Sequence, residues 1–218
     1  MKEIGHIYLV WRPRKGERRQ IVGIIRRNST EGTRFKYTIT EKKAQEMGFV
    51  PYTDFPKLTI EYTENVLDIF GQRLTKSDRG DIQKYYDFWE VDPNFKDDKF
   101  YLLAHTQGLL ATDNFEFLAD FSPSKDLSFT SEICGLSHNK ISPDAIEEGD
   151  ELRWEFEANN KYDSSAIKVF KKDIFLGYVK MAHSKVFYKK GGKNLKIKVK
   201  NIGKNGYLNE VFIKVYNP

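Results

Sequence analysis

A chain of 218 residues is long enough for one large domain or two small ones, each with its own hydrophobic core. Hydrophobic residues make up 39% and charged residues 31%, which indicates a folded, soluble protein, and no apolar run approaches the roughly 20 residues of a membrane span. The single cysteine, Cys134, excludes an internal disulfide and a cysteine-based zinc site, so we expect a cytoplasmic protein.

The formal net charge of +5 is unevenly distributed along the chain. Residues 1–40 contain ten basic and three acidic side chains, residues 41–122 contain nine and sixteen, and residues 123–218 contain seventeen and twelve. Two basic regions therefore flank an acidic middle. This pattern favours a polyanionic partner at one or both ends, while the acidic middle is equally suited to docking a protein.

The first predicted element is a β-hairpin with a strongly basic tip. Clustered β-forming residues predict strands at residues 4–11 and 20–25. The connection between them, residues 12–19, contains five basic side chains. These side chains can bind phosphate as point charges or through arginine forks, or they can simply be solvated at a turn.

A strand and two helices are predicted after the hairpin. Residues 35–39 predict the strand, and residues 40–48 predict a short helix with Thr40 as its N-cap and Gly48 as its stop. The aromatic segment at residues 82–89 predicts a further helix. Its aromatic residues either seal the core of the first module or form a docking surface.

The order of motifs in the first half resembles the small N-terminal subdomain of the HipA-type toxin kinases. A strand with the sequence FKY is followed by Phe55-Pro56, by Gln72-Arg73-Leu74 and, after the aromatic helix, by the run LLAHTQG at residues 102–108. The resemblance spans residues 4–120. It implies a small α+β module that packs against a kinase and, as a separate chain, can restrain one. Kinase activity is not implied, because the sequence has no glycine-rich ATP loop and no HRD-like or DFG-like motif.

Within this module, the candidate docking surface is the aromatic helix, with Trp89 beside Tyr85, Tyr86 and Phe88. Aromatic residues at spacings of three and four are also typical of a helix that seals a core, which is the competing interpretation. His105 is interpreted as a structural histidine rather than a catalyst.

A linker is predicted between two domains. Residues 118–127, LADFSPSKDL, mix Ser, Pro, Lys and Asp after a periodic segment. We therefore expect a first domain at residues 1–122 and a second at residues 128–218. From Leu152 to Val179 the second domain shows the pattern strand, polar loop, strand, turn and strand.

The second domain resembles a HIRAN domain. Gly135-Leu136 is followed by a strand, by the run EANNKYDSSAIKV at residues 157–169, and by Gly177-Tyr178-Val179. The resemblance covers residues 129–216 and implies an OB-like β-barrel with small helices. The version of this domain found in DNA-remodelling helicases captures single-stranded DNA at a free 3′ end. The expected fold class is thus α+β, with a HipA-N-like module followed by an OB-like HIRAN barrel.

The resemblance implies a nucleic-acid site around the polar loop. Asn160, Tyr162 and Asp163 would form the pocket for the strand end, with Asp163 accepting a hydrogen bond from the terminal hydroxyl. Tyr162 would stack on a base, an interaction worth roughly 1–3 kcal/mol. In the alternative interpretation, the Tyr162-Asp163 pair is an Asx-type loop cap with a packed tyrosine.

The resemblance implies three further contacts to nucleic acid, and at one of them the chain differs from the helicase members of the family. Tyr178 stands where a histidine is common in the family, and Lys180 would reach a phosphate. Helicase members have a basic residue followed by an aromatic after Gly-Leu, whereas this chain has Ser137 and His138. His138 would stack on a base or donate to a phosphate, so the sequence predicts nucleic-acid binding, and the departure concerns 3′-end specificity.

The lysine-rich tail indicates nucleic-acid binding without reference to a family. From Lys185 to Asn209 there are eight lysines and no acidic residue. Apolar residues 195, 197 and 199 alternate with lysines after Gly191-Gly192, so a hairpin turning there would place a lysine row outside. Such a row tracks a phosphate backbone, or it protects a sheet edge from aggregation. The favoured contacts are Lys185, Lys189 and Lys190.

The sequence favours a non-enzymatic accessory protein that binds DNA as a single strand or an end. Its setting would be DNA repair, defence against phages or other mobile elements, or a toxin–antitoxin operon. The alternative is an antitoxin-like module that restrains a HipA-type kinase, or another operon partner, through the N-terminal domain. No catalytic constellation, metal site or cofactor site is legible, because the four histidines at 6, 105, 138 and 183 fall at unrelated positions.

Overall fold

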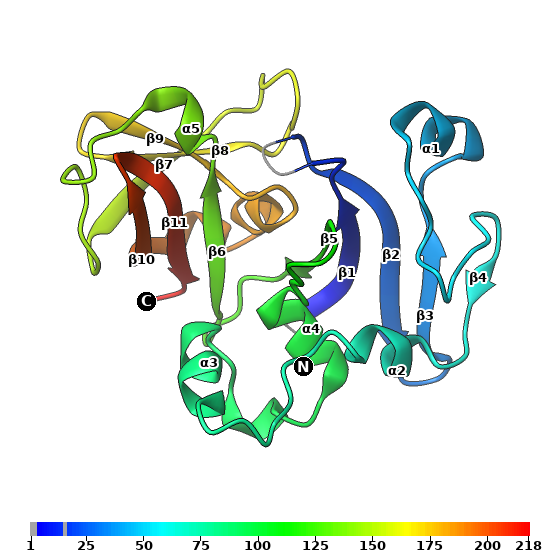
Figure 1. Cartoon of the computed structure of the whole chain (residues 1–218). Helices are drawn as coiled ribbons and strands as arrows, with labels where there is room; N and C mark the ends of the chain where they lie inside the picture. Colours follow the sequence, from blue (N-terminus) through cyan, green and yellow to red (C-terminus); the bar gives the residue numbers. More distant parts are fainter. Residues whose placement is uncertain (1–3, 15–16) are drawn as a thin grey trace. The chain divides into compact units, whose positions relative to one another are not determined.

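The structure, a computed structural model, describes residues 4–14 and 17–218. They form two compact units, Ile4–Asp120 and Phe121–Pro218 (Figure 1). Among these residues, no helix has the length and apolar character needed to cross a membrane. The chain is a mixed α/β protein, and each unit is built around its own sheet.

The N-terminal unit contains a five-stranded sheet with the order β4-β3-β2-β1-β5. Helices lie in the connection between β3 and β4 and in the long connection from β4 to β5 (Figure 1). The elements are β1 Ile4–Trp11, β2 Gln20–Asn28, β3 Gly32–Tyr37, α1 Glu41–Met47, β4 Glu61–Tyr62, α2 Val66–Gly71, α3 Ile82–Phe88, η1 Pro93–Phe95, α4 Lys99–Thr106 and β5 Phe115–Phe121.

The predicted hairpin and the first helix are confirmed. β1 and β2 pair antiparallel, and the opposed Ile7 and Ile25 are both fully buried, as expected for strands with an apolar face. At α1 the Thr40 hydroxyl oxygen accepts a hydrogen bond from the Lys43 amide at 3.2 Å. Gly48 ends the helix in the left-handed conformation with φ 66°.

Aromatic residues fill the core of this unit. The Phe35 ring lies 5.2 Å from Phe55 and 5.1 Å from Phe70. On α3, Tyr86 is buried, as is Trp89 directly after the helix, which supports the interpretation that these residues seal the core. His105 on α4 is 2% exposed, in agreement with a structural role.

The linker predicted from Leu118 begins too early. β5 extends to Phe121, and Leu118 and Ala119 are fully buried in the sheet, so these residues complete a core strand instead. The sequence pattern missed this because the strand runs directly into the polar stretch around Pro123.

The C-terminal unit is a closed barrel with the strand order β10-β11-β6-β9-β8-β7. This is consistent with the predicted OB-like architecture. Its elements are β6 Ser128–Cys134, α5 Leu136–Asn139, β7 Glu151–Phe156, β8 Ile167–Lys171, β9 Ile174–Val179, η2 His183–Tyr188, η3 Gly192–Asn194, β10 Lys196–Asn205 and β11 Tyr207–Tyr216.

The strand, loop, strand, turn and strand pattern predicted for residues 152–179 is confirmed as β7, β8 and β9. Gly177 is required where β9 crosses close to β6, because it adopts a φ of 150° and a Cβ there would overlap the carbonyl oxygen of Cys134. The motif glycine therefore allows two barrel strands to approach each other.

The lysine strand is confirmed, but its turn lies elsewhere. Ile197 and Val199 are buried on β10, while Lys196 and Lys198 are exposed. The hairpin turns at Gly206 between β10 and β11, where φ is 73°. The prediction of a hairpin turn at Gly191-Gly192 is wrong, because Gly191 precedes and Gly192 begins η3, the short helix before β10.

Candidate nucleic-acid interface

The loop between β7 and β8 is held in shape by Asn160. Its side-chain oxygen accepts hydrogen bonds from the backbone amides of Tyr162 at 2.9 Å and Asp163 at 3.1 Å. Its amide group donates to the Glu157 carboxylate at 2.6 Å. Asn160 therefore acts as an Asx-type brace that fixes the loop.

Asp163 continues this brace towards the second half of the loop. One carboxylate oxygen accepts from the Ser165 amide at 2.8 Å, and the other lies 3.4 Å from the Ser184 hydroxyl on η2. The loop-cap interpretation thus holds for Asp163. A carboxylate has about four lone-pair sites, so both oxygens retain room for another donor.

The Tyr162 ring is exposed to solvent and is not buried in the protein. Its side chain is 70% exposed, although its backbone is fixed by Asn160. The part of the alternative interpretation that expects a packed tyrosine is therefore wrong. A fixed backbone with an exposed ring is the arrangement that a stacking platform for a base requires.

Tyr178 on β9 lies beneath the loop and is half-buried. Burial, and then a hydrogen bond to the Glu157 carboxylate, raise the pKa of Tyr178. Hydrogen bonds from Asn160 and from Lys168, whose Nζ lies 2.5 Å from Glu157 Oε1, lower the pKa of Glu157. Glu157 therefore stays ionised and joins the loop to the strands below it.

Two exposed aromatic residues next to the loop were missed by the sequence analysis. Phe156 and Tyr188 are 40% and 41% exposed, and their rings meet edge to face at 4.6 Å. The Tyr188 hydroxyl donates to the carbonyl of Ala166, where the loop ends, at 3.2 Å. The signal for Phe156 was the apolar alternation of β7, which continues to the last residue of the strand.

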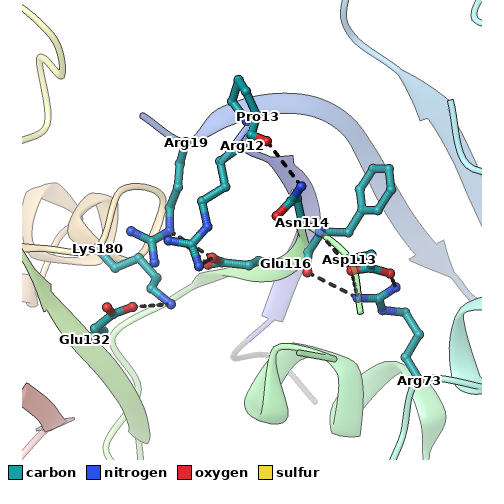
Figure 2. A network of polar contacts seen from close by, with 10 residues as sticks. Arg12, Pro13, Arg19, Arg73, Asp113, Asn114, Glu116, Glu132 and Lys180 are labelled. Carbon is teal, nitrogen blue, oxygen red and sulfur yellow. Dashed lines mark hydrogen bonds and ion pairs between the residues drawn. The ribbon is translucent and has the colours of Figure 1, made fainter. Parts of the chain in front are cut away.

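Lys180 is not available to contact a phosphate, contrary to the prediction. Its side chain is 1% exposed, and its Nζ lies 2.9 Å from Glu132 Oε2 (Figure 2). Burial of an ammonium group requires a partner of this kind. The expectation that Lys180 reaches a phosphate is corrected, since its charge is neutralised inside the protein.

The other predicted contacts differ in their accessibility. His138 on α5 and Lys190 after η2 are exposed, and Lys185 is half-buried. Lys189 is half-buried, and its ammonium group donates to the carbonyl of Phe121 at 2.6 Å. Lys190 and His138 are therefore the predicted cationic and donor groups most accessible to a ligand.

Two arginines of the basic hairpin tip, Arg12 and Arg19, bind a buried carboxylate, whereas Arg18 is exposed. Glu116 on β5 is 2% exposed and accepts from Arg19 Nε at 3.0 and 3.1 Å. Arg12 Nη2 lies 3.2 Å from the same carboxylate (Figure 2). Arg14 is exposed and faces Glu17 at 4.0 Å, whereas Lys15 and Gly16 lie outside the described residues.

A metal site is not found among the described residues, because no group of three or more His, Cys, Asp or Glu side chains there could hold an ion. Around the loop, Tyr162 can stack on a base, Asp163 can accept a hydrogen bond, and Lys190 provides a positive charge.

Comparison with protein families matches residues 127–199 to the HIRAN domain. The predicted HIRAN domain in the C-terminal unit is thereby confirmed, whereas the resemblance of residues 1–122 to the HipA subdomain receives no support and stays a prediction. No curated protein matches the chain.

Two solved structures are similar to the chain over less than half of its length. One is the HIRAN domain of human HLTF, with 18% identity, coverage of 40% of this chain and 74% of that one, and a TM-score of 0.33. The other is a protein from Lactobacillus plantarum, with 17% identity, coverage of 42% and 98%, and a TM-score of 0.31.

Proposed function

We propose that this chain is a non-enzymatic accessory protein whose HIRAN domain binds DNA as a single strand or an end. The observation that supports the proposal most strongly is the exposed Tyr162 ring on a loop whose backbone is fixed by Asn160. The match of residues 127–199 to the HIRAN domain supports DNA as the ligand. Single-strand binders of this kind combine stacking platforms with a cationic surface.

In this proposal the base of a terminal nucleotide stacks on Tyr162. Phosphates nearby are contacted by Lys190 and by His138 when it donates a hydrogen bond. Because each neutralised phosphate releases counterions, the affinity falls as the salt concentration rises. The binding is insensitive to sequence, since every base offers a face for stacking.

The first experiment measures binding of a 5′-labelled single-stranded oligonucleotide to the full chain by fluorescence anisotropy at low salt. Tyr162→Ala is expected to weaken binding by roughly 1–3 kcal/mol through loss of one stacked base. Tyr207→Ala is the matched control, because Tyr207 is 51% exposed at the β10–β11 turn. Absence of wild-type binding, or equal losses in both variants, would contradict the proposal.

A second experiment addresses the strand end. We propose that Asp163 accepts a hydrogen bond from a terminal 3′-hydroxyl, for which its carboxylate retains acceptor sites. A 3′-phosphate then binds worse than a 3′-hydroxyl, because two anionic groups meet. Asp163→Ala should remove this preference, and Asp163→Asn, which keeps one acceptor and the loop bond to Ser165, separates end recognition from folding.

The docking of residues 1–122 onto a HipA-type kinase stays a prediction. Tyr86 and Trp89, half of the aromatic cluster predicted to dock, are buried, which favours the core-sealing role over a contact surface. Co-purification of the full chain with such a kinase, lost on substitution of the half-buried Tyr85, would revive the kinase-binding alternative.

A further inference from the structure

A groove of about 810 Å³ lies on the barrel wall, away from the residues named so far for binding. Its walls come from β7, from η3, from the first residues of β10 and from the last two residues, Asn217 and Pro218. The groove exists because the ladder between β7 and β10 is short. Within the part of the chain that the structure describes, only Leu152 and Glu151 of β7 pair with β10, because β10 begins at Lys196 and the chain before it forms η3.

The charged side chains that line the groove are predominantly basic. Arg153, Lys193 and Lys196 face a single acidic lining residue, Glu151. Lys193 and Lys196 are exposed, whereas Arg153 stacks over the Phe170 ring at 4.3 Å and forms an ion pair with Glu155. The charge of Arg153 is already paired with Glu155, so the two exposed lysines are the groups that suit a phosphate backbone better than an uncharged ligand.

An aromatic row connects the groove to the β7–β8 loop. Trp154 lines the groove, and its indole nitrogen donates to the Leu195 carbonyl at 2.9 Å, which fixes the ring. Trp154 meets Phe156 at 5.1 Å, and Phe156 meets Tyr188 at 4.6 Å. Tyr188 in turn bonds the end of the loop at Ala166. The exposed rings of Phe156 and Tyr188 thus lie between the groove and the loop.

We infer that the groove is a second subsite, which takes the phosphate backbone of the same DNA single strand several nucleotides away from the Tyr162 loop. The strand passes over Phe156 and Tyr188, on which intervening bases stack, and its phosphates reach Lys193 and Lys196. This inference rests on the proposed function and adds to it the path of the strand and a minimum ligand length. Site sizes of about 4–16 nucleotides are typical of OB-type folds.

The test compares 5′-labelled oligothymidylates of about 4 and about 12 nucleotides, both with a 3′-hydroxyl, on the full chain. The longer strand should bind at least tenfold more tightly. In Lys193→Ala/Lys196→Ala most of this length advantage should disappear, and the salt slope for the longer strand should fall by about 0.7 for each lysine. The short strand should be little affected.

The matched control is Lys204→Ala, because Lys204 is exposed on the same strand, β10, at the end remote from the groove. Phe156→Leu keeps apolar packing at the barrel rim but removes the stacking face, and it should reduce the length advantage as well. An unchanged length advantage and salt slope in the double lysine variant would overturn the subsite while leaving loop binding intact. Failure of the wild type to bind either strand would overturn the proposed function itself, and the subsite with it.

Discussion

Two regions of the chain contain closely spaced basic residues. One is the hairpin tip of the N-terminal unit, and the other is the lysine-rich segment of the C-terminal unit. In the structure they differ. Arg12 and Arg19 converge on the buried Glu116, whereas Lys190, Lys193 and Lys196 are exposed. A count of charges therefore predicts a polyanion site equally for both regions, whereas in the structure a distant carboxylate binds two arginines of the tip and leaves Arg14 and Arg18 exposed. Glu116 lies 97 residues from Arg19 in the sequence.

The comparison predicts that the two regions respond differently to mutation. Arginines of the tip should influence the stability of their own unit, and lysines of the barrel should influence binding.

Replacing Glu116 by Gln should destabilise the N-terminal unit by about 3–5 kcal/mol, because two arginines would lose the carboxylate that neutralises them in a mostly buried site. Urea denaturation followed by circular dichroism measures the change. Glu17→Gln is the control, since Glu17 is an exposed partner of Arg14 at 4.0 Å and its loss should change stability by less than about 0.5 kcal/mol. Equal losses of stability in the two variants would show that the buried Glu116 pairs contribute no more than the exposed Arg14–Glu17 pair.

The stability of the N-terminal unit should also depend on pH through His105. Burial lowers the pKa of His105 to about 4, so the folded state holds the ring neutral while the unfolded state binds a proton below about 6.5. The contribution is fully present above pH 6.5 and is lost as the pH falls towards 4, by up to about 3 kcal/mol.

Thermal unfolding of wild type and His105→Phe between these pH values checks this contribution. The variant keeps a ring to stack on Tyr101 but cannot titrate. The difference between the two proteins should therefore shift in favour of the variant at low pH. A difference that is constant with pH would show that His105 does not titrate in this window.

In the barrel, Asn160→Ala should weaken DNA binding by about 1–2 kcal/mol, because the loop loses three side-chain hydrogen bonds that hold Tyr162 and Asp163 in place. The neighbouring Asn159 is exposed, and Asn159→Ala serves as the control in the same anisotropy titration. If both substitutions leave the affinity unchanged, the loop does not need its brace for binding.

The smallest effect concerns single exposed cations. Lys190→Ala should lower the slope of log affinity against log salt by about 0.7, since one phosphate contact on a single strand is lost. Arg14→Ala removes an exposed charge from the hairpin tip and should leave the slope unchanged. The reverse result would place the phosphate contacts on the N-terminal unit.

Much of the fold could be predicted because the signals are local. The alternation in β7, β8 and β9, the Thr40 cap and the Gly48 stop each act within a few residues. The division between the two units, after Asp120, lies within the predicted linker, but the start of the linker could not be placed, since burial of Leu118 and Ala119 depends on a sheet formed by distant strands. The turn at Gly206 was missed because two adjacent glycines gave a stronger local signal.

For the candidate site, the sequence predicted the loop but not the residues around it. Asn160, Tyr162 and Asp163 belong to one contiguous motif. The structure adds that Asn160 and Asp163 hold the loop backbone by hydrogen bonds, whereas the Tyr162 ring is exposed. Lys180 was misassigned because its partner Glu132 lies on another strand. The groove results from the short ladder between β7 and β10, a tertiary feature that leaves no pattern in the sequence.

The most direct test is to titrate a short single-stranded oligonucleotide into the isotope-labelled full chain and to map the backbone amide shifts by NMR. We predict that signals of residues 159–165 and of Lys190 move, while those of Arg12, Arg14 and Arg19 stay in place. Shifts confined to the hairpin tip, with the β7–β8 loop unaffected, would contradict the account and assign DNA binding to the other unit.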